Sequence, residues 1–231
     1  MFSGRWTVMA TYAKSTTTKS KFIMSAYRHL ESQDDSTLTV RALAAENGYS
    51  VAALYKHFES LEYLLVVASI KFIGEYLSEY ACLLDGSKSP LQIYAEGWDV
   101  FIECAFGRPD IFHRIFWEIE QEDLEHAFID YYRVFPPEDP ELNAVQFSVL
   151  ITNDDLRGRD RTLLGPLVKC GELDAEGLKF LSMSTELIVS GLLKRAIGAS
   201  EEERDSLKRH CRELVSRNIS QCTECAHGSS K

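Results

Sequence analysis

Four neighbouring residues near the amino-terminal end of the chain carry side chains suited to contact a nucleic acid. Ala52, Ala53, Lys56 and His57 stand at positions that an amphipathic helix turns away from its core. The two small residues let a helix backbone approach base edges closely, and Lys56 can reach a phosphate oxygen or a guanine edge. The pattern therefore predicts a short surface helix that lies in the major groove of DNA.

Two short helices around a tight turn are expected to hold these side chains in place. Thr39 is a suitable N-cap for the first helix. Asn47-Gly48 ends that helix because glycine takes a left-handed conformation without a Cβ clash. Ser50 can cap the second helix. The residues expected on buried faces are Val40, Leu43 and Ala44 on the first helix, and Val51, Leu54, Tyr55 and Phe58 on the second.

Residues 39–64 resemble the DNA-binding segment of the tetracycline-repressor (TetR) family, whose motif runs T-x-x-x-I-A-x-x-A-G-V-S-x-x-x-L-Y-x-H-F-x-S-K-E-x-L. The positions that match at the same spacing are Thr39, Ala44, Gly48, Ser50, Leu54, Tyr55, His57, Phe58, Ser60, Glu62 and Leu64. Asn47, Tyr49 and Leu61 depart from the motif. The resemblance implies that a lysine at the position of Leu61 touches a DNA phosphate, so this contact is not expected here.

The resemblance also implies a role for each matching residue of the segment. The implied contacts are to phosphates from Thr39 and Tyr55, and to base edges from Ser50, Val51, Ala52, Ala53 and Lys56, while His57 completes the predicted DNA-binding set. A following helical domain that binds a small ligand and forms a dimer is implied as well. The alternative for the segment is a helical hairpin that binds nothing.

The composition is that of an ordinary globular protein. The chain of 231 residues is 45% hydrophobic and 26% charged, which suits one compact unit or two small ones. No apolar run approaches the roughly 20 residues that a membrane helix needs. Residues 2–12 lack the apolar core of a signal peptide. These features predict a cytoplasmic protein without a membrane partner.

The net charge of −10 is unusual for a DNA-binding protein, but the charge is unevenly distributed. Residues 1–66 hold seven basic and six acidic side chains, so the remaining residues carry −11. Residues 14–28 contain four basic side chains and no acidic one. A basic arm and a near-neutral head can meet DNA while an acidic body points away. We expect modest non-specific affinity.

The six cysteines are interpreted as reduced thiols and not as metal ligands. Cys82, Cys104 and Cys170 stand in helical, largely apolar contexts that are typical of buried thiols. Cys222 and Cys225 form one C-x-x-C pair in a polar tail, which lacks the second pair that a zinc site normally shows. No metal ligand and no cofactor is expected, and a redox response of the tail stays an open alternative.

Helical periodicity extends along the whole chain, without an alternating strand pattern or an internal repeat. The predicted fold is all-α, with a flexible arm (1–18), a helix-turn-helix DNA-binding domain (19–65), a helical ligand-binding and dimerisation domain (66–219) and a disordered tail (220–231). The expected helices span 19–31, 60–85, 90–106, 111–117, 124–134, 142–157, 162–170, 174–199 and 200–219, besides the two short ones.

Large rings are frequent between residues 94 and 147. Most of them must belong to the core, but an all-helical domain with so many rings can also leave a cavity for an apolar or aromatic ligand. His113 can supply a polar contact to that ligand, with a structural histidine as the alternative. The predicted ligand-binding residues are Trp98, Phe101, Phe112, His113, Phe116, Trp117, Tyr131 and Phe147.

No catalytic motif is visible, since the sequence holds no glycine-rich phosphate loop, no Gly-x-Ser-x-Gly and no His-Glu-x-x-His. We expect no enzyme but a homodimeric repressor that binds a palindromic operator in double-stranded DNA and is released by a small-molecule effector. The dimer interface is expected in the apolar segments 142–157 and 174–199. The alternative is a TetR-like sensor or interaction protein that has lost operator binding.

Overall fold

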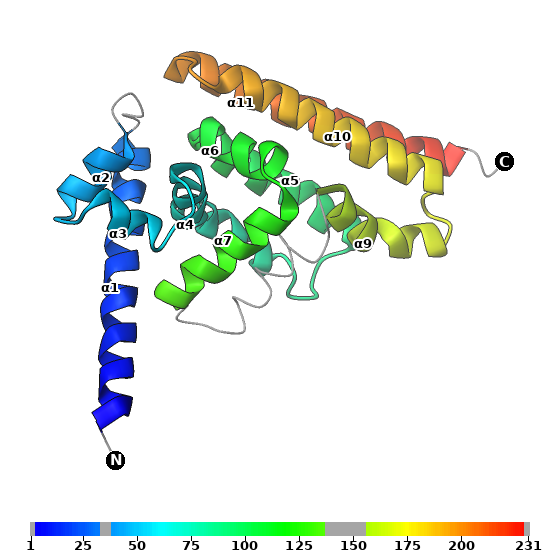
Figure 1. Ribbon diagram of the computed structural model, residues 1–231. Helices are drawn as coiled ribbons and strands as arrows, with labels where there is room; N and C mark the ends of the chain where they lie inside the picture. The colour runs from blue at the N-terminus through cyan, green and yellow to red at the C-terminus, as the bar shows by residue number, and fades with distance from the viewer. Residues whose placement is uncertain (1–2, 33–37, 137–155, 229–231) are drawn as a thin grey trace. The chain divides into compact units, whose positions relative to one another are not determined.

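The computed structural model of the chain describes residues 3–32, 38–136 and 156–228, and the side chains of residues 17–32, 38–120, 122–136 and 158–222. Within these ranges the protein is helical and contains no strand, which confirms the predicted all-α class (Figure 1). None of the helices so described is both long and apolar enough to cross a membrane. Most of the predicted helix 142–157 lies outside the described residues.

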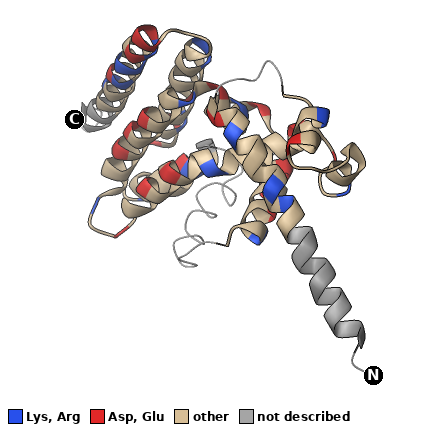
Figure 2. Cartoon of the chain, turned by 90° about the vertical axis from the view of Figure 1, so that its left-hand side faces the viewer, with Lys and Arg blue, Asp and Glu red and all other residues tan. Residues whose placement is uncertain are grey.

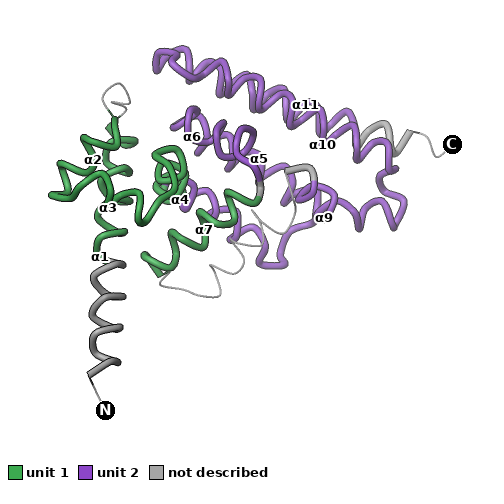
Figure 3. Tube along the Cα trace, viewed as in Figure 1, with its two compact units in different colours: residues 1–71, 122–138 green, residues 72–121, 139–231 purple. Residues whose placement is uncertain are grey.

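The chain forms two compact units (Figure 3). Unit 1 comprises residues 1–71 and 122–138, and unit 2 comprises residues 72–121 and 139–231. The division falls inside α4 (Leu61–Cys82), not at the expected residue 65. Unit 1 also includes most of α7 (Gln121–Val134), which the sequence assigned to the later domain. Helical periodicity shows that α7 has an apolar face but not which helices that face contacts, so the sequence could not place it.

Unit 1 is built around α1 (Ser3–Ser32), α2 (Val40–Glu46) and α3 (Val51–Tyr55). The helix α1 begins at Ser3, where the sequence predicted a flexible arm. Residues 5–31 contain neither glycine nor proline, so no residue in this stretch interrupts a helix. The apolar core of the three helices consists of Phe22, Ile23, Ala26, Leu30, Leu43, Ala44, Leu54 and Phe58, all of them buried.

Unit 2 contains the end of α4 and five further α-helices in its described part. They are α5 (Pro90–Gly107), α6 (Pro109–His113), α9 (Leu156–Lys169), α10 (Ala175–Ala196) and α11 (Glu201–Gly228), with the π-helical turn η2 (Arg114–Glu118) after α6. Ser89 and Gln92 form a capping box at the start of α5. The helix α11 continues to Gly228, so residues 220–228 are helical where a disordered tail was predicted.

The helices α10 and α11 form a hairpin and lie side by side (Figure 1). The turn between them includes Gly198 at a φ of 75°, a conformation that glycine adopts without strain. Asn218 on α11 is buried, and its amide donates hydrogen bonds to Ser184 Oγ at 2.8 Å and Thr185 Oγ1 at 2.9 Å on α10. The hairpin is therefore held by a polar contact within an otherwise apolar interface.

A close approach of α5 to the end of α4 depends on a glycine. A Cβ atom added at Gly97 would lie 2.6 Å from Cε2 of Tyr80, which is too near for any real contact. The Tyr80 ring thus occupies the space that a side chain at residue 97 would need.

Two cysteines expected to be buried differ from that prediction, because Cys82 and Cys170 are exposed at the ends of their helices.

Candidate nucleic-acid interface

Hydroxyl caps fix the first turn of both short helices in unit 1. Thr39 Oγ1 accepts a hydrogen bond from the amide of Ala42 at 3.1 Å, and Ser50 Oγ accepts one from the amide of Ala53 at 3.2 Å. Each bond satisfies an amide that would otherwise lack a partner inside its helix. Both predicted caps are confirmed, and the positions of the helix starts are set by the sequence itself.

The turn between α2 and α3 ends the first helix in the predicted way. Gly48 has a φ of 70°, and its amide donates to the carbonyl of Ala45 at 3.0 Å. The amide of Tyr49 donates to the carbonyl of Ala44 at 2.8 Å. These two bonds form a Schellman motif, which requires a left-handed residue at the position of Gly48. A side chain at this position would therefore strain the turn.

The eight predicted DNA-contacting residues lie on or beside these two helices. Five are exposed, namely Thr39, Ser50, Ala52, Tyr55 and Lys56, and three are half-buried, namely Val51, Ala53 and His57. The expectation that Tyr55 belongs to the buried face is wrong, because 52% of this residue is exposed. Leu54 and Phe58 fill the core below α3, and the position after Leu54 is rotated away from it.

Two basic side chains meet at the carboxyl end of α3. Lys56 is exposed and forms no ion pair with any described residue. His57 is half-buried, and its pKa is lowered by burial and by the neighbouring charges of Lys19 and Lys56. The imidazole is therefore neutral near neutral pH, and Lys56 supplies the positive charge of this helix end.

Several other cations of unit 1 are already engaged with partners inside the protein. Arg28 and His29 lie 3.3 Å and 2.9 Å from the carboxylate of Glu46. The ammonium group of Lys21 lies 5.6 Å from the centre of the Tyr49 ring. Figure 2 shows that basic and acidic residues both occur along the helices. Few cations of this surface are therefore without a partner among the described residues, and the modest DNA affinity expected from the sequence stays a prediction.

A polar network beside α3 was not predicted. One carboxylate oxygen of Asp130 on α7 lies 2.8 Å from the ammonium group of Lys19. The hydroxyl of Tyr63 donates a hydrogen bond of 3.0 Å to the other oxygen of Asp130. Burial and the Asp130 carboxylate raise the pKa of Tyr63, so its hydroxyl stays protonated. A groove of about 380 Å³ next to this network is lined by His57, Tyr63, Asp130 and their neighbours. The network connects α1, α4 and α7 through one carboxylate.

Most of the aromatic residues predicted to bind a ligand form one cluster in unit 2. Trp98, Phe101 and Phe112 are buried, and the ring of Phe101 lies 4.9 Å from Phe116 and 5.5 Å from Trp98 between ring centres. Edge-to-face contacts of this kind are favourable core packing. Tyr131 does not belong to this cluster, since it lies in unit 1 against Tyr132 and Phe135, and Phe147 lies outside the described residues.

The polar residues at the edge of this cluster have partners within unit 2. His113 lies 3.0 Å from the carboxylate of Glu118, and its pKa is lowered by burial and by the charge of Lys194. The indole of Trp117 donates to Glu186 at 3.3 Å. The imidazole predicted to contact a ligand is thus held by a neighbouring carboxylate.

A buried ion pair under the aromatic rings was also missed. The guanidinium of Arg159 donates to Asp160 at 3.1 Å and to the hydroxyl of Tyr76 at 2.9 Å, and it lies 4.9 Å from the centre of the Trp98 ring. Ser182 donates to the other oxygen of Asp160 at 2.8 Å. In the sequence, Arg159 and Asp160 stand in a run of alternating charges. Such a run is usually a solvated surface, so no local signal indicated that the two residues are buried.

Comparisons with known proteins do not identify the chain. No protein-family model matches it, and neither the curated proteins nor the solved structures include one with significant similarity. In the part of the chain that the structure describes, no three His, Cys, Asp or Glu side chains converge as metal ligands would.

Proposed function

We propose that this protein is a DNA-binding transcriptional regulator of the tetracycline-repressor type, acting as a homodimeric repressor that a small effector releases from its operator. The observation that carries the proposal is the exposed surface of α3. Tyr55 and Lys56 project from a short helix whose start is fixed by Ser50, and residues 39–64 match the family motif at eleven positions. A rigid, capped helix with a small-residue face is suited to the major groove.

The exposed groups have the chemistry that DNA contacts need. The hydroxyls of Thr39 and Ser50 accept their capping bonds and can still donate a hydrogen to a phosphate oxygen. Tyr55 can donate its phenolic hydrogen in the same way, and Lys56 can pair with a phosphate or a guanine edge. The small side chain of Ala52 leaves room for the helix to approach the bases.

An exposed apolar stripe on α10 supports the dimer. Phe180, Met183 and Leu187 follow one another at helical spacing, and they are 57%, 41% and 62% exposed. Gly191, one turn later, has open space beside it and permits a close helix approach. The stripe lies within the segment 174–199 predicted to pair. Two such subunits would present two copies of α3 to half-sites one helical turn of DNA apart, or a multiple of it.

A buried hydrogen-bond donor supports an effector site in the aromatic cluster. Nε1 of Trp98 is buried and has no acceptor with normal hydrogen-bond geometry within the described part of the chain, the side chain of Tyr94 being its polar neighbour. An apolar or aromatic effector with one acceptor atom could satisfy this donor while its rings replace contacts among Phe101, Phe112 and Phe116. Such an effector would weaken DNA binding only through different affinities for the two conformations of the protein.

The decisive experiment selects bound sequences from random double-stranded DNA with the purified protein. Lys56→Ala should then weaken binding to the selected DNA by roughly one to three kcal/mol if the ammonium reads a base. Tyr55→Phe, which removes only a hydroxyl, should weaken it by about 1 kcal/mol. Arg209→Ala on α11 is the control, since it removes an equal charge from an exposed helix position.

Failure to enrich any sequence would favour the alternative function. Leu61 is the first residue of α4 and is half-buried, where the family motif has a phosphate-binding lysine. This substitution favours a sensor or interaction protein that has kept the fold and lost operator binding. Equal binding of all three variants at every salt concentration would likewise contradict the assignment of α3.

A further inference from the structure

A groove between α9 and α10 in unit 2 has the size and lining of a small-molecule site. Its volume is about 570 Å³, within the range of roughly 300–1,000 Å³ that is usual for ligand pockets. Val168 from α9 and Leu178 and Met183 from α10 make its walls apolar. Met183 is 41% exposed, so the groove is accessible from the surface of unit 2.

Among the residues that the structure describes, the charged ones that line this groove are all basic. Lys169 comes from the last turn of α9 and Lys179 from the second turn of α10, so the two ammonium groups belong to opposite walls. Both lysines are exposed, and neither forms an ion pair with a described residue. Arg161 also lines the groove. In a chain with a net charge of −10, an apolar groove whose described charged residues are all cations is a local exception.

Three acidic residues stand near these lysines in sequence, and the exposed Glu176 on α10 does not line the groove. Glu172 accepts a hydrogen bond from Cys170 at 3.3 Å, and Asp174 caps α10 by accepting from the amide of Gly177 at 2.6 Å. Neither of these carboxylates lines the groove. Within the described part of the lining, the two lysine charges therefore face no carboxylate, and a bound anion could supply one.

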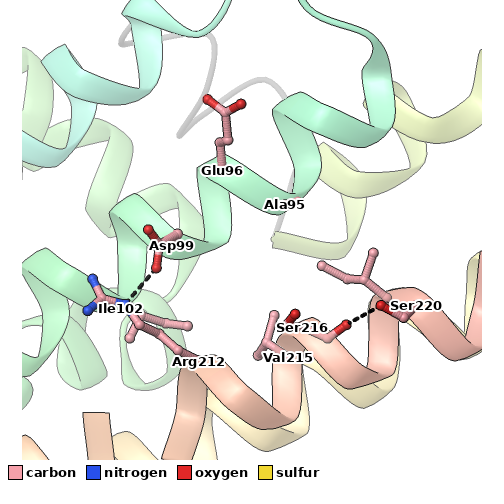
Figure 4. A pocket seen from close by; sticks show the side chains of 9 residues that line it. Ala95, Glu96, Asp99, Ile102, Arg212, Val215, Ser216 and Ser220 are labelled. Atoms are coloured by element: carbon pink, nitrogen blue, oxygen red, sulfur yellow. Dashed lines mark hydrogen bonds and ion pairs between the residues drawn. The ribbon is translucent and has the colours of Figure 1, made fainter. Parts of the chain in front are cut away.

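A second groove in unit 2 gives the contrast. It lies between α5 and α11, has a volume of about 460 Å³ and is shown in Figure 4. Its charges satisfy one another, because Arg212 lies 2.6 Å from Asp99 and Glu96 lies 3.6 Å from Lys88. A charged ligand entering there would have to break ion pairs that already exist, whereas Lys169 and Lys179 of the α9–α10 groove form no ion pair with a described residue.

We propose that the α9–α10 groove binds a single-chain amphipathic anion, namely a medium- to long-chain fatty acid. The carboxylate would pair with Lys169 and Lys179, and the hydrocarbon chain would lie against Val168, Leu178 and Met183. Charge-assisted hydrogen bonds position the head group, and burial of the chain provides most of the affinity. This inference does not depend on DNA binding, because the groove lies apart from α3 and is tested without DNA, although its wall residue Met183 also belongs to the α10 stripe proposed for the dimer.

The test is calorimetric titration of the full-length protein with dodecanoate below its micelle concentration. Dodecylamine, a cation of equal chain length, is the matched ligand control. Dodecanoate should bind about tenfold or more tightly than dodecylamine, since only the anion pairs with the lysines. Lys169→Glu and Lys179→Glu should each weaken dodecanoate binding by about tenfold, whereas Arg209→Glu, which changes the net charge equally, should leave it unchanged.

A third variant separates the groove from other apolar sites in the protein. Val168→Trp fills the groove and keeps both lysines, and it should abolish dodecanoate binding while thermal unfolding shows that the variant is folded. Three results would overturn the proposal: no heat of binding, equal binding of the amine, or dodecanoate binding that survives both charge reversals. Dodecanoate binding that survives both charge reversals would mean that the fatty acid binds at another site. The absence of any heat of binding would favour a second copy of the chain as the occupant of the groove.

Discussion

The ammonium group of Lys19 on α1 lies 2.8 Å from a carboxylate oxygen of Asp130 on α7, and more than four fifths of each side chain is shielded from solvent. We expect this pair to contribute to the stability of unit 1. A double-mutant cycle with Lys19→Met and Asp130→Asn should give a coupling energy of about 1–2 kcal/mol, between the values for exposed and fully buried pairs. Urea unfolding of the four proteins measures it.

Arg133 provides the matched control for this cycle. Its guanidinium lies 3.4 Å from the same carboxylate, but 58% of its side chain is exposed. Arg133→Met should therefore couple to Asp130→Asn by no more than about 0.5 kcal/mol. Equal coupling energies for the two cations would show that burial does not strengthen the Lys19 pair.

Gly97→Ala should destabilise unit 2. The added methyl group would lie 2.6 Å from the Tyr80 ring, so the ring or α5 would have to move. Overpacking of this kind costs about 1–3 kcal/mol, and a lower melting temperature in differential scanning calorimetry would report it. Gly74→Ala on α4 is the control, because its Cβ would meet nothing within 4 Å. That substitution should stabilise the helix by up to about 1 kcal/mol. An unchanged melting temperature for Gly97→Ala would contradict the close approach.

The ion pairs between α5 and α11 should make stability depend on acid pH. Hydrogen bonds from Lys208 and Arg212 hold the pKa of Glu103 below its ordinary value of 4.5. A carboxyl whose pKa is lowered by folding stabilises the fold above that ordinary value and loses this contribution as the pH falls through its folded-state pKa. Glu103→Gln should therefore cost no more than about 1 kcal/mol at pH 7, since the pair is exposed.

Chemical denaturation at several pH values checks this prediction. The stability difference between the wild-type protein and Glu103→Gln should shrink as the pH falls below about 4. Glu79→Gln on α4, at an exposed position without a described ion pair, is the control for the change in net charge. A difference for Glu103→Gln that stays constant from pH 7 to pH 3 would mean that the lowered pKa is not the cause.

The cysteines should differ in reactivity according to their burial. Burial raises the pKa of the Cys211 thiol to about 12, and burial together with the carboxylates of Glu79, Glu75 and Glu103 raises that of Cys104 to about 12. Brief treatment of the native protein with iodoacetamide at pH 8 should modify Cys82 and Cys170, which are exposed, and spare the other two.

Peptide mapping by mass spectrometry reads out this pattern directly. After unfolding in urea, Cys104 and Cys211 should react as fast as Cys82 and Cys170. This result would show that burial, and not a prior chemical modification of the thiols, protects them in the native protein. Modification of Cys211 in the native protein at the rate of Cys82 would show that α11 opens from α10 in solution.

Local features of this fold could be predicted from the sequence. The caps at Thr39 and Ser50 and the left-handed Gly48 depend on bonds between residues three to five positions apart, so their residue types identify them. Tyr55 was wrongly placed in the core, because helical spacing alone does not say how wide the buried face of a five-residue helix is. The break expected before residue 19 also failed, since a polar composition does not stop a helix.

Long-range features could not be predicted. The position of α7 in unit 1 depends on Asp130 meeting Lys19 and Tyr63, which are 111 and 67 residues away in the sequence. The buried pair of Arg159 and Asp160 depends on Tyr76 and Ser182, which come from other helices. A charged residue is assigned to the surface unless its partner is known, and a single sequence does not show partners that are distant along the chain.

The buried amide of Asn218 determines how α10 and α11 are aligned along their length in the hairpin. A slip of one helical turn, roughly 5.4 Å, would carry the amide past Ser184 and Thr185 and leave its polar atoms unpaired among leucines. Apolar interdigitation alone would tolerate such a slip far better than this amide does. Asn218 thus fixes the position of Phe180, Met183 and Leu187 along α11, so these three residues form one defined apolar surface.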